Sequence, residues 1–264
     1  MRGLVRACHP EPTAAVTIVA ALLAIVVGRS AGAVAAITVA VLASQLAVGW
    51  TNDWLDAGRD AETGRQDKPI PRGEVSRRTV GVGAVIAAVA TVPLALLSGP
   101  VPGVYLIVGM ICGLLYDWPL KFTPASPAPY VVAFGALAAF VAGTRFWWLI
   151  VAAALLGGGA HFVNVLPDLE DDLRSGVRGL PHRIGPTASW AAGGTLLVAA
   201  TAALVFGPAG APSWPGLAVL AAAVVVLPTG WYLSRRPGSR AAFRSVLVVA
   251  LADVILLLVS GTTG

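Results

Sequence analysis

Long apolar segments alternate with short polar or turn-forming connections along the whole chain. The apolar segments fall at 13–28, 31–50, 79–98, 101–116, 128–143, 146–166, 188–207, 214–233 and 241–260. Each approaches the ~20 residues that an α-helix needs to cross a ~30 Å hydrocarbon core. None has the alternating polarity of a transmembrane β-strand. The pattern predicts an all-α, polytopic membrane protein, with about nine transmembrane helices in a bundle around a central cavity.

Composition supports this assignment. Apolar residues make up 57% of the 264 residues and charged residues 12%, and the mean hydropathy is +0.81. These values exclude an ordinary soluble domain and make the lipid bilayer the expected surroundings. We interpret residues 1–264 as a single integral-membrane domain. The two cysteines, Cys8 and Cys112, suit neither a disulfide framework nor a cysteine metal site.

The basic residues report the orientation in the membrane. The net charge is +5 and the pI is about 9.8. If the N-terminus is cytoplasmic, all 18 lysines and arginines except Arg29 and Arg145 fall on the inside. This bias follows the positive-inside rule. It predicts a bacterial-type cell membrane with the N-terminus and the active site on the cytoplasmic side, and no nucleic acid partner.

The acidic residues are concentrated in two connections. All 13 except Glu11, Asp117 and Asp253 lie in the loops at 51–78 and 167–187. An offset of 112 residues superposes the two loops on one pattern, N-x-x-x-D-x-x-x-D-x-x-x-G. The superposed pairs are Asn52 with Asn164, Asp56 with Asp168, Asp60 with Asp172 and Gly64 with Gly176. We interpret the match as two pseudo-repeated halves that face each other across a cavity.

Spacing of four residues places each row of polar side chains on one stripe of a helix that extends beyond the bilayer. Like charges three or four residues apart repel each other on a bare helix, so such a row favours a bound cation. Oxygen ligands without a histidine or cysteine cluster favour Mg²⁺, which binds through one or two carboxylates plus substrate phosphate oxygens. The alternative is a pair of solvated acidic faces that are neutralised by nearby arginines.

Two carboxylate rows that hold Mg²⁺ could clamp a diphosphate from opposite sides. Neutralising this leaving group would let an allylic C–O bond ionise, because the developing negative charge meets preorganised positive charge. A long isoprenoid tail could lie among the apolar helices while its diphosphate stays at the cytoplasmic rim.

These motifs resemble those of the UbiA-type superfamily of membrane prenyltransferases. The first family motif, N-D-x-x-D-x-x-x-D, is matched by Asn52, Asp53, Asp56 and Asp60. The second, D-x-x-x-D, is matched by Asp168 and Asp172, with Asp171 as an additional candidate. After its first motif the family carries a basic residue followed by P-[IL]-P, and Lys68 with the P-I-P that follows it is similar to this element. The tyrosine–lysine element is similar to YDWPLK, where Tyr116 and Lys121 stand one residue further apart than in the family pattern.

The resemblance implies Mg²⁺-dependent transfer of a prenyl group from a prenyl diphosphate to a hydrophobic acceptor, with an aromatic ring or quinone precursor as the leading class. The implied metal ligands are Asp53, Asp56, Asp60, Asp168, Asp171 and Asp172, and all of these except Asp171 are also the expected catalytic residues. The substrate-binding candidates are Asn52, Lys68, Arg72, Tyr116, Lys121, Asn164 and Arg178, with Arg65 as a further phosphate candidate.

Two other functions fit a helical bundle with an acidic cavity. A terpene cyclase on the same fold would ionise a prenyl diphosphate without an acceptor, and the motifs do not separate it from a transferase. A transporter or cation-binding membrane protein would need ionisable residues in the middle of the membrane. The apolar segments are nearly free of such residues, and Asp253 is the main exception.

Overall fold

The computed structural model describes residues 2–64, 68–234 and 241–260, and all regular structure within these ranges is helical. The predicted all-α class is therefore confirmed. In chain order the elements are α1 (Arg2–Arg6), α2 (Pro10–Val26), α3 (Ala31–Glu62), α4 (Arg77–Leu96), α5 (Pro100–Asp117), the 3-10 turn η1 (Leu120–Phe122), α6 (Pro127–Ala142), α7 (Trp147–Val165), the 3-10 turn η2 (Leu166–Asp168), α8 (Leu169–Arg174), α9 (Leu180–Phe206), α10 (Trp214–Ser234) and α11 (Ala241–Ser260).

Several of these helices can cross a bilayer. Six apolar stretches among the described residues have the necessary length and hydropathy. Five are the helices α3, α4, α5, α9 and α10, and the sixth is the continuous run from Trp147 in α7 to Arg174 in α8. The helices α2 and α6 are apolar but shorter. The chain is thus a multi-pass integral membrane protein, and the count of nine spanning helices stays a prediction.

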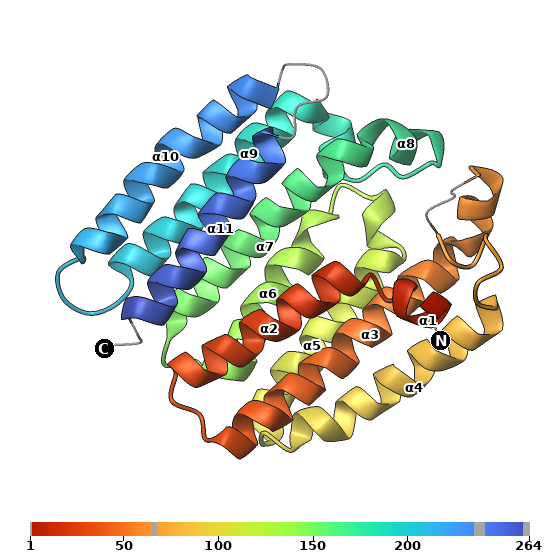
Figure 1. Ribbon diagram of the computed structural model, residues 1–264, viewed down its shortest axis with the longest axis horizontal. Helices are drawn as coiled ribbons and strands as arrows, with labels where there is room; N and C mark the ends of the chain where they lie inside the picture. Colours follow the sequence, from red (N-terminus) through yellow and green to blue (C-terminus); the bar gives the residue numbers. More distant parts are fainter. Residues whose placement is uncertain (1, 65–67, 235–240, 261–264) are drawn as a thin grey trace.

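Helices that follow one another in the chain pack side by side, and α11 also packs against α2, which closes the order of helices into a ring (Figure 1). The outward faces of the bundle carry large apolar side chains. On α4, for example, Val85, Ile86 and Val89 are all exposed. Such a surface is unfavourable in water but matches lipid tails, as expected for a bundle in a bilayer.

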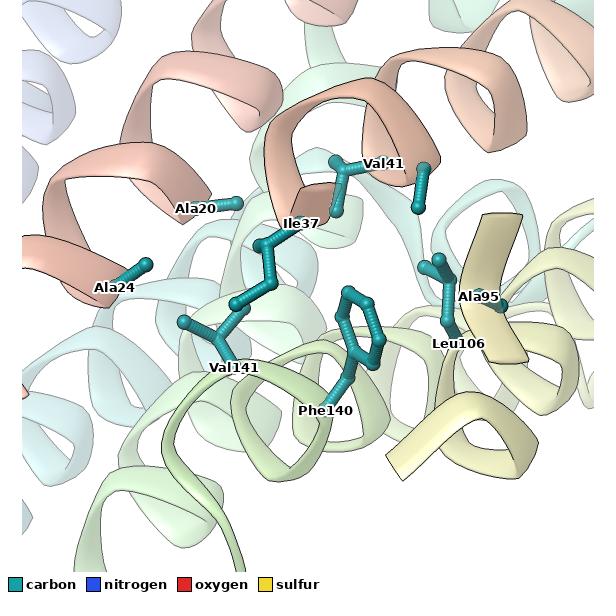
Figure 2. Packing of buried hydrophobic residues seen from close by; sticks show 9 residues of the cluster. Ala20, Ala24, Ile37, Val41, Ala95, Leu106, Phe140 and Val141 are labelled. Atoms are coloured by element: carbon teal, nitrogen blue, oxygen red, sulfur yellow. The ribbon is translucent and has the colours of Figure 1, made fainter. Parts of the chain in front are cut away.

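The interior holds a packed apolar cluster formed by α2, α3, α4, α5 and α6 (Figure 2). Its α2 residues are the small side chains of Ala20 and Ala24, which allow α2 to approach α3 closely. Ile37 and Phe140 fill the space between the helices. This cluster lies about three to four helical turns along α3 from the acidic motif, so it closes the bundle on the side away from the charged connections.

The first acidic motif lies on a continuous helical extension. With 32 residues, α3 exceeds the ~20 that a bilayer crossing needs, so its C-terminal turns project beyond the hydrocarbon core. The helix ends where Gly64 adopts a positive φ of 69°, a conformation that glycine reaches without a Cβ clash. The predicted one-sided stripe is therefore present in this half.

The second motif is built differently from the predicted straight extension. The helix α7 ends at Val165, and η2 and α8 carry the acidic residues. Pro167 lies at the break, and its missing N–H and its ring disfavour a continuous α-helix. Figure 1 shows α8, the C-terminal end of α3 and α1 at the same end of the bundle.

Candidate functional site

A polar cavity of about 460 Å³ lies at the end of the bundle where the two acidic connections meet. Asp56 and Asp60 reach it from α3, and Asp168 and Asp172 reach it from η2 and α8. The remaining lining residues are Arg6, His9, Pro10, Glu11, Pro12, Asn52, Arg59, Lys68, Pro69, Tyr116, Lys121, Ser175 and Val177. Two motifs that are far apart in the sequence thus contribute carboxylates to one cavity, mixed with cationic side chains.

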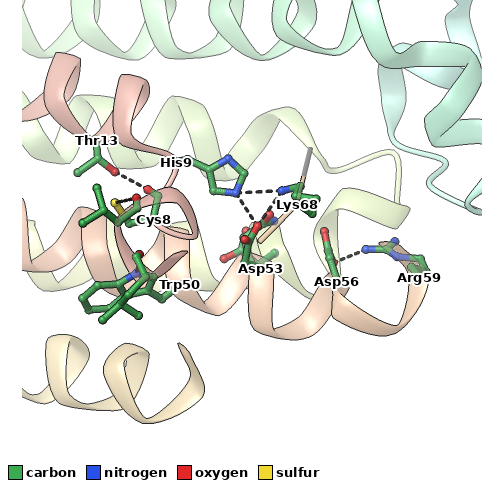
Figure 3. Close-up of polar contacts among 12 residues, drawn as sticks. Cys8, His9, Thr13, Trp50, Asp53, Asp56, Arg59 and Lys68 are labelled. Carbon is green, nitrogen blue, oxygen red and sulfur yellow. Dashed lines mark hydrogen bonds and ion pairs between the residues drawn. The ribbon is translucent and has the colours of Figure 1, made fainter. Parts of the chain in front are cut away.

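Asp56 is held by a buried lysine. The Nζ of Lys121 lies 2.7 Å from both carboxylate oxygens of Asp56, and Lys121 is only 5% exposed. The guanidinium of Arg59, one turn further along α3, donates to the same carboxylate (Figure 3). Lys121 reaches this position because α5 ends at Asp117 and η1 turns the chain back toward α3. The extra residue in the tyrosine–lysine spacing therefore leaves Lys121 on the cavity wall.

Asp53 lies beside the cavity without lining it. The carboxylate is 2% exposed, and its Oδ1 accepts from Lys68 Nζ at 2.7 Å and lies 3.0 Å from His9 Nε2 (Figure 3). Lys68 and His9 do line the cavity. A buried carboxylate needs partners of this kind, because an unpaired charge in a low dielectric is strongly destabilising. Asp53 therefore orients Lys68 and His9 at the cavity wall.

The N-terminal segment that carries His9 is fixed against α3. Thr13 Oγ1 donates to the carbonyl oxygen of Cys8 at 2.7 Å, and Trp50 Nε1 donates to the carbonyl oxygen of Leu4 at 2.9 Å. A Cβ at Gly49 would lie 2.5 Å from the same Cys8 oxygen, so the close approach requires glycine there. Burial raises the pKa of the Cys8 thiol, which favours its neutral form.

In the second motif, Asp172 is supported from behind by a buried histidine. His182 Nε2 lies 3.1 Å from Asp172 Oδ2, and the His182 side chain is 2% exposed. This contact fixes one oxygen of a carboxylate that lines the cavity. Asp168, one turn earlier on η2, is exposed at the cavity surface.

An apolar pocket of about 330 Å³ continues from the polar cavity toward the bundle interior. Four residues line both spaces: His9, Pro12, Asn52 and Tyr116. Asn52 is oriented by its Nδ2, which donates to Asp117 Oδ1 at 3.0 Å. Asn164, the repeat partner of Asn52, lines the same apolar pocket. Both asparagines thus line the apolar pocket, and each stands four residues before an aspartate that lines the polar cavity.

Three other predicted residues do not line either space. Arg72 pairs with Glu74 at 3.0 Å, and Asp171 pairs with Arg174 at 3.1 Å. Arg178 is exposed, and its carbonyl oxygen accepts from Arg183 Nε. Arg65 lies outside the described residues.

Sequence reasoning missed several residues of this region, notably His9, Arg59 and His182. Arg59 follows Asp56 at the helical i+3 spacing, so its place on the stripe was readable from the sequence. His9 and His182 carry no such signal, because each meets its aspartate only through folding.

The acidic residues of the cavity suit Mg²⁺, although no group of three or more His, Cys, Asp or Glu side chains in the described part of the chain is close enough to hold a metal by itself. Mg²⁺ commonly binds through one or two carboxylates and completes its shell with water and substrate phosphate oxygens. Two aspartates on each side of the cavity, with cationic side chains between them, form a donor set that fits a metal–diphosphate group.

Comparison with known proteins identifies the family. The profile described as the UbiA prenyltransferase family matches residues 13–252. The chain belongs to the UbiA prenyltransferase family. A curated relative, the bacteriochlorophyll synthase 33 kDa chain of Cereibacter sphaeroides, is 31% identical over 166 residues, which is 55% of this chain. The match spans 53% of that relative's length.

Solved UbiA structures share the fold. A structure of digeranylgeranylglyceryl phosphate synthase has a TM-score of 0.71 at 16% identity, and the match covers 99% of this chain and 98% of the other. A UbiA homologue from Aeropyrum pernix has a TM-score of 0.71 at 18% identity, with 95% and 98% covered. A UbiA homologue from Archaeoglobus fulgidus, bound to GPP and Mg²⁺, has a TM-score of 0.71 at 15% identity, with 98% of each chain covered.

Proposed function

We propose that this member of the UbiA family transfers a prenyl group from a prenyl diphosphate to a hydrophobic acceptor, with Mg²⁺ as cofactor. One observation carries the proposal. The carboxylates of both motifs line a polar cavity, and this cavity shares four lining residues with an apolar pocket. The two spaces match the two parts of a prenyl diphosphate, a polyanionic head and an isoprenoid tail.

The proposed residue roles follow from position. Asp56, Asp60, Asp168 and Asp172 would hold Mg²⁺, which when bound neutralises the diphosphate as the leaving group departs. Lys68, Lys121 and Arg59 line the same cavity and would donate to phosphate oxygens. Asn52 and Tyr116, at the boundary of the two spaces, would lie beside the first carbon of the prenyl group. Asp53 would act by orienting Lys68 and His9.

The reaction breaks the bond between that carbon and the diphosphate oxygen, and the diphosphate leaves with the electron pair of that bond. The acceptor supplies the electron pair of the new bond and then loses its proton to a nearby base or phosphate oxygen. The buried position of Lys121 keeps its charge in a low dielectric, where its interaction with developing negative charge is stronger than in water. Arg72, Asp171 and Arg178 would act outside the cavity, at its cytoplasmic rim.

For the acceptor we propose an aromatic ring or a quinone precursor. The wall at the boundary carries Tyr116, whose ring packs edge-on against Tyr130 with centroids 4.9 Å apart. Both rings line the apolar pocket. Aromatic faces and edges of this kind favour contact with a flat ring.

The test is incubation of the purified protein in detergent with Mg²⁺ and a series of prenyl diphosphates, with and without a pool of aromatic acceptors. Diphosphate release and the organic extract are then measured, the latter by mass spectrometry. A prenylated product that requires acceptor supports the proposal. Terpene hydrocarbon or alcohol without acceptor would instead identify a cyclase, and absence of Mg²⁺-dependent diphosphate release would contradict both.

A further inference from the structure

The apolar pocket ends at a closed wall within the bundle. Its deepest lining residues on α3, α5 and α6 are Ser44, Leu106 and Leu137. Leu106 belongs to the packed cluster of Figure 2, and Leu137 packs against it. Behind them, Val41 and Phe140 are at most 1% exposed. The pocket therefore has a floor of tightly packed side chains.

The helices give the depth of this pocket. From Asn52 at the mouth to Ser44, α3 advances about 12 Å, since each residue of an α-helix rises ~1.5 Å. From Tyr116 to Leu106, α5 advances about 15 Å by the same measure. An extended isoprene unit has four carbon–carbon bonds of ~1.5 Å in a zigzag, so it spans roughly 5 Å. The pocket accepts a tail of about two to three units.

We propose that the donor is geranyl or farnesyl diphosphate, and that Leu106 and Leu137 set the upper limit on the length of its tail. This inference rests on the proposed function. A geranylgeranyl tail would need to displace the packed cluster or leave its last unit outside the pocket. A further apolar cavity of about 100 Å³, deeper between α2 and α7, shares no lining residue with this pocket in the described part of the chain.

The floor discriminates between donors because apolar contact is gained only for the units that fit. One methylene more or less in an apolar pocket changes selectivity by about tenfold or more. A dimethylallyl tail leaves most of the pocket unfilled and loses the contacts that longer donors make. The expected order of kcat/KM is therefore farnesyl and geranyl above both dimethylallyl and geranylgeranyl diphosphate.

Two substitutions on α5 should shift this order in opposite directions. Leu106→Ala removes the floor side chain and should raise the ratio of geranylgeranyl to farnesyl turnover by about tenfold. Gly109→Ala adds a methyl group at mid-depth, where its Cβ would meet the carbonyl oxygen of Ala133 at 3.4 Å, an ordinary contact. It should lower the ratio of farnesyl to geranyl turnover by a similar factor.

Ile111→Ala is the matched control, because Ile111 lies on the same helix, is exposed, and lines neither space. It should leave the order of donors unchanged. If Leu106→Ala does not fold, Leu137→Ala tests the same floor, since Leu137 is only partly buried and its loss disturbs the packed cluster less.

The experiment measures Mg²⁺-dependent diphosphate release from the four donors by each variant, together with donor binding by thermal stabilisation in detergent. Preference for geranylgeranyl diphosphate in the unsubstituted protein, or unchanged ratios of donor turnover in both α5 variants, would overturn the length limit while leaving the prenyltransferase proposal intact. Absence of binding and release with every donor would overturn the proposed function itself.

Discussion

Asp56 and Asp168 are separated by 112 positions in the sequence, and both line the same polar cavity. The first projects from the long helix α3, and the second from the 3-10 turn η2. Their repeat neighbours Asp60 and Asp172 line this cavity as well. The sequence repeat therefore corresponds to two groups of carboxylates around one space, which is the arrangement that a metal–diphosphate clamp requires.

Replacement of either aspartate should remove turnover. We expect Asp56→Asn and Asp168→Asn each to lower diphosphate release by about a hundredfold or more, because each loses a charge that the metal–diphosphate group needs. Glu170→Gln is the control, since Glu170 on α8 is exposed and does not line the cavity. Full activity in either aspartate variant, with an unchanged thermal midpoint, would contradict the clamp.

Metal removal should have the same effect on the unsubstituted protein. Chelation with EDTA should abolish diphosphate release, and added Mg²⁺ should restore it. Calcium should restore less, since it prefers longer bonds and more ligands than a carboxylate–phosphate site for Mg²⁺ supplies. Activity that persists after exhaustive chelation would argue against the metal.

Asp53 should matter for stability as well as for activity. Asp53→Ala removes the carboxylate that pairs with Lys68, whose side chain is largely buried. The loss of this partner should cost about 3 kcal/mol in the free energy of unfolding. Combining Asp53→Asn with Lys68→Met removes both charges, so it should recover part of the stability but not the activity. Thermal unfolding in detergent and diphosphate release measured on the same samples separate the two effects. Equal stability of Asp53→Ala and the double variant would show that the unpaired charge of Lys68 is not the cause of the loss.

The contact between α3 and the N-terminal segment gives a packing prediction. Gly49→Ala would place a Cβ 2.5 Å from the carbonyl oxygen of Cys8 and push away the segment that carries His9. We expect a loss of about 2 kcal/mol, as for other overpacked sites, together with reduced turnover. Gly194→Ala on α9 is the matched control, because a Cβ there meets nothing within 4 Å. It should be neutral or stabilising by about 0.5–1 kcal/mol.

The orientation in the membrane can be tested by cysteine accessibility. In a Cys8→Ser and Cys112→Ser background, Thr63→Cys lies on the acidic side of the bundle, and Ala209→Cys lies in the connection between α9 and α10. Both native side chains are exposed. An impermeant maleimide applied to intact cells should label position 209 and not position 63. The reverse labelling would invert the topology inferred from the basic residues.

The sequence by itself determined the fold class, the approximate helix positions and the two acidic motifs. These features depend on local information, because hydropathy over ~20 residues decides whether a helix can lie in a bilayer. The four-residue spacing likewise decides which side chains share a face of α3. Arg59 could be placed near Asp56 for the same reason.

Only the tertiary structure decided what each charged residue contacts. Asp53 and Asp56 lie on the same helix, yet the first is buried against Lys68 and His9 while the second faces the cavity and Lys121. These partners come from segments that meet α3 only when the bundle closes. The break at Pro167 and the packed floor below the apolar pocket likewise depend on how several helices fit together, and spacing within one segment carries no information about such contacts.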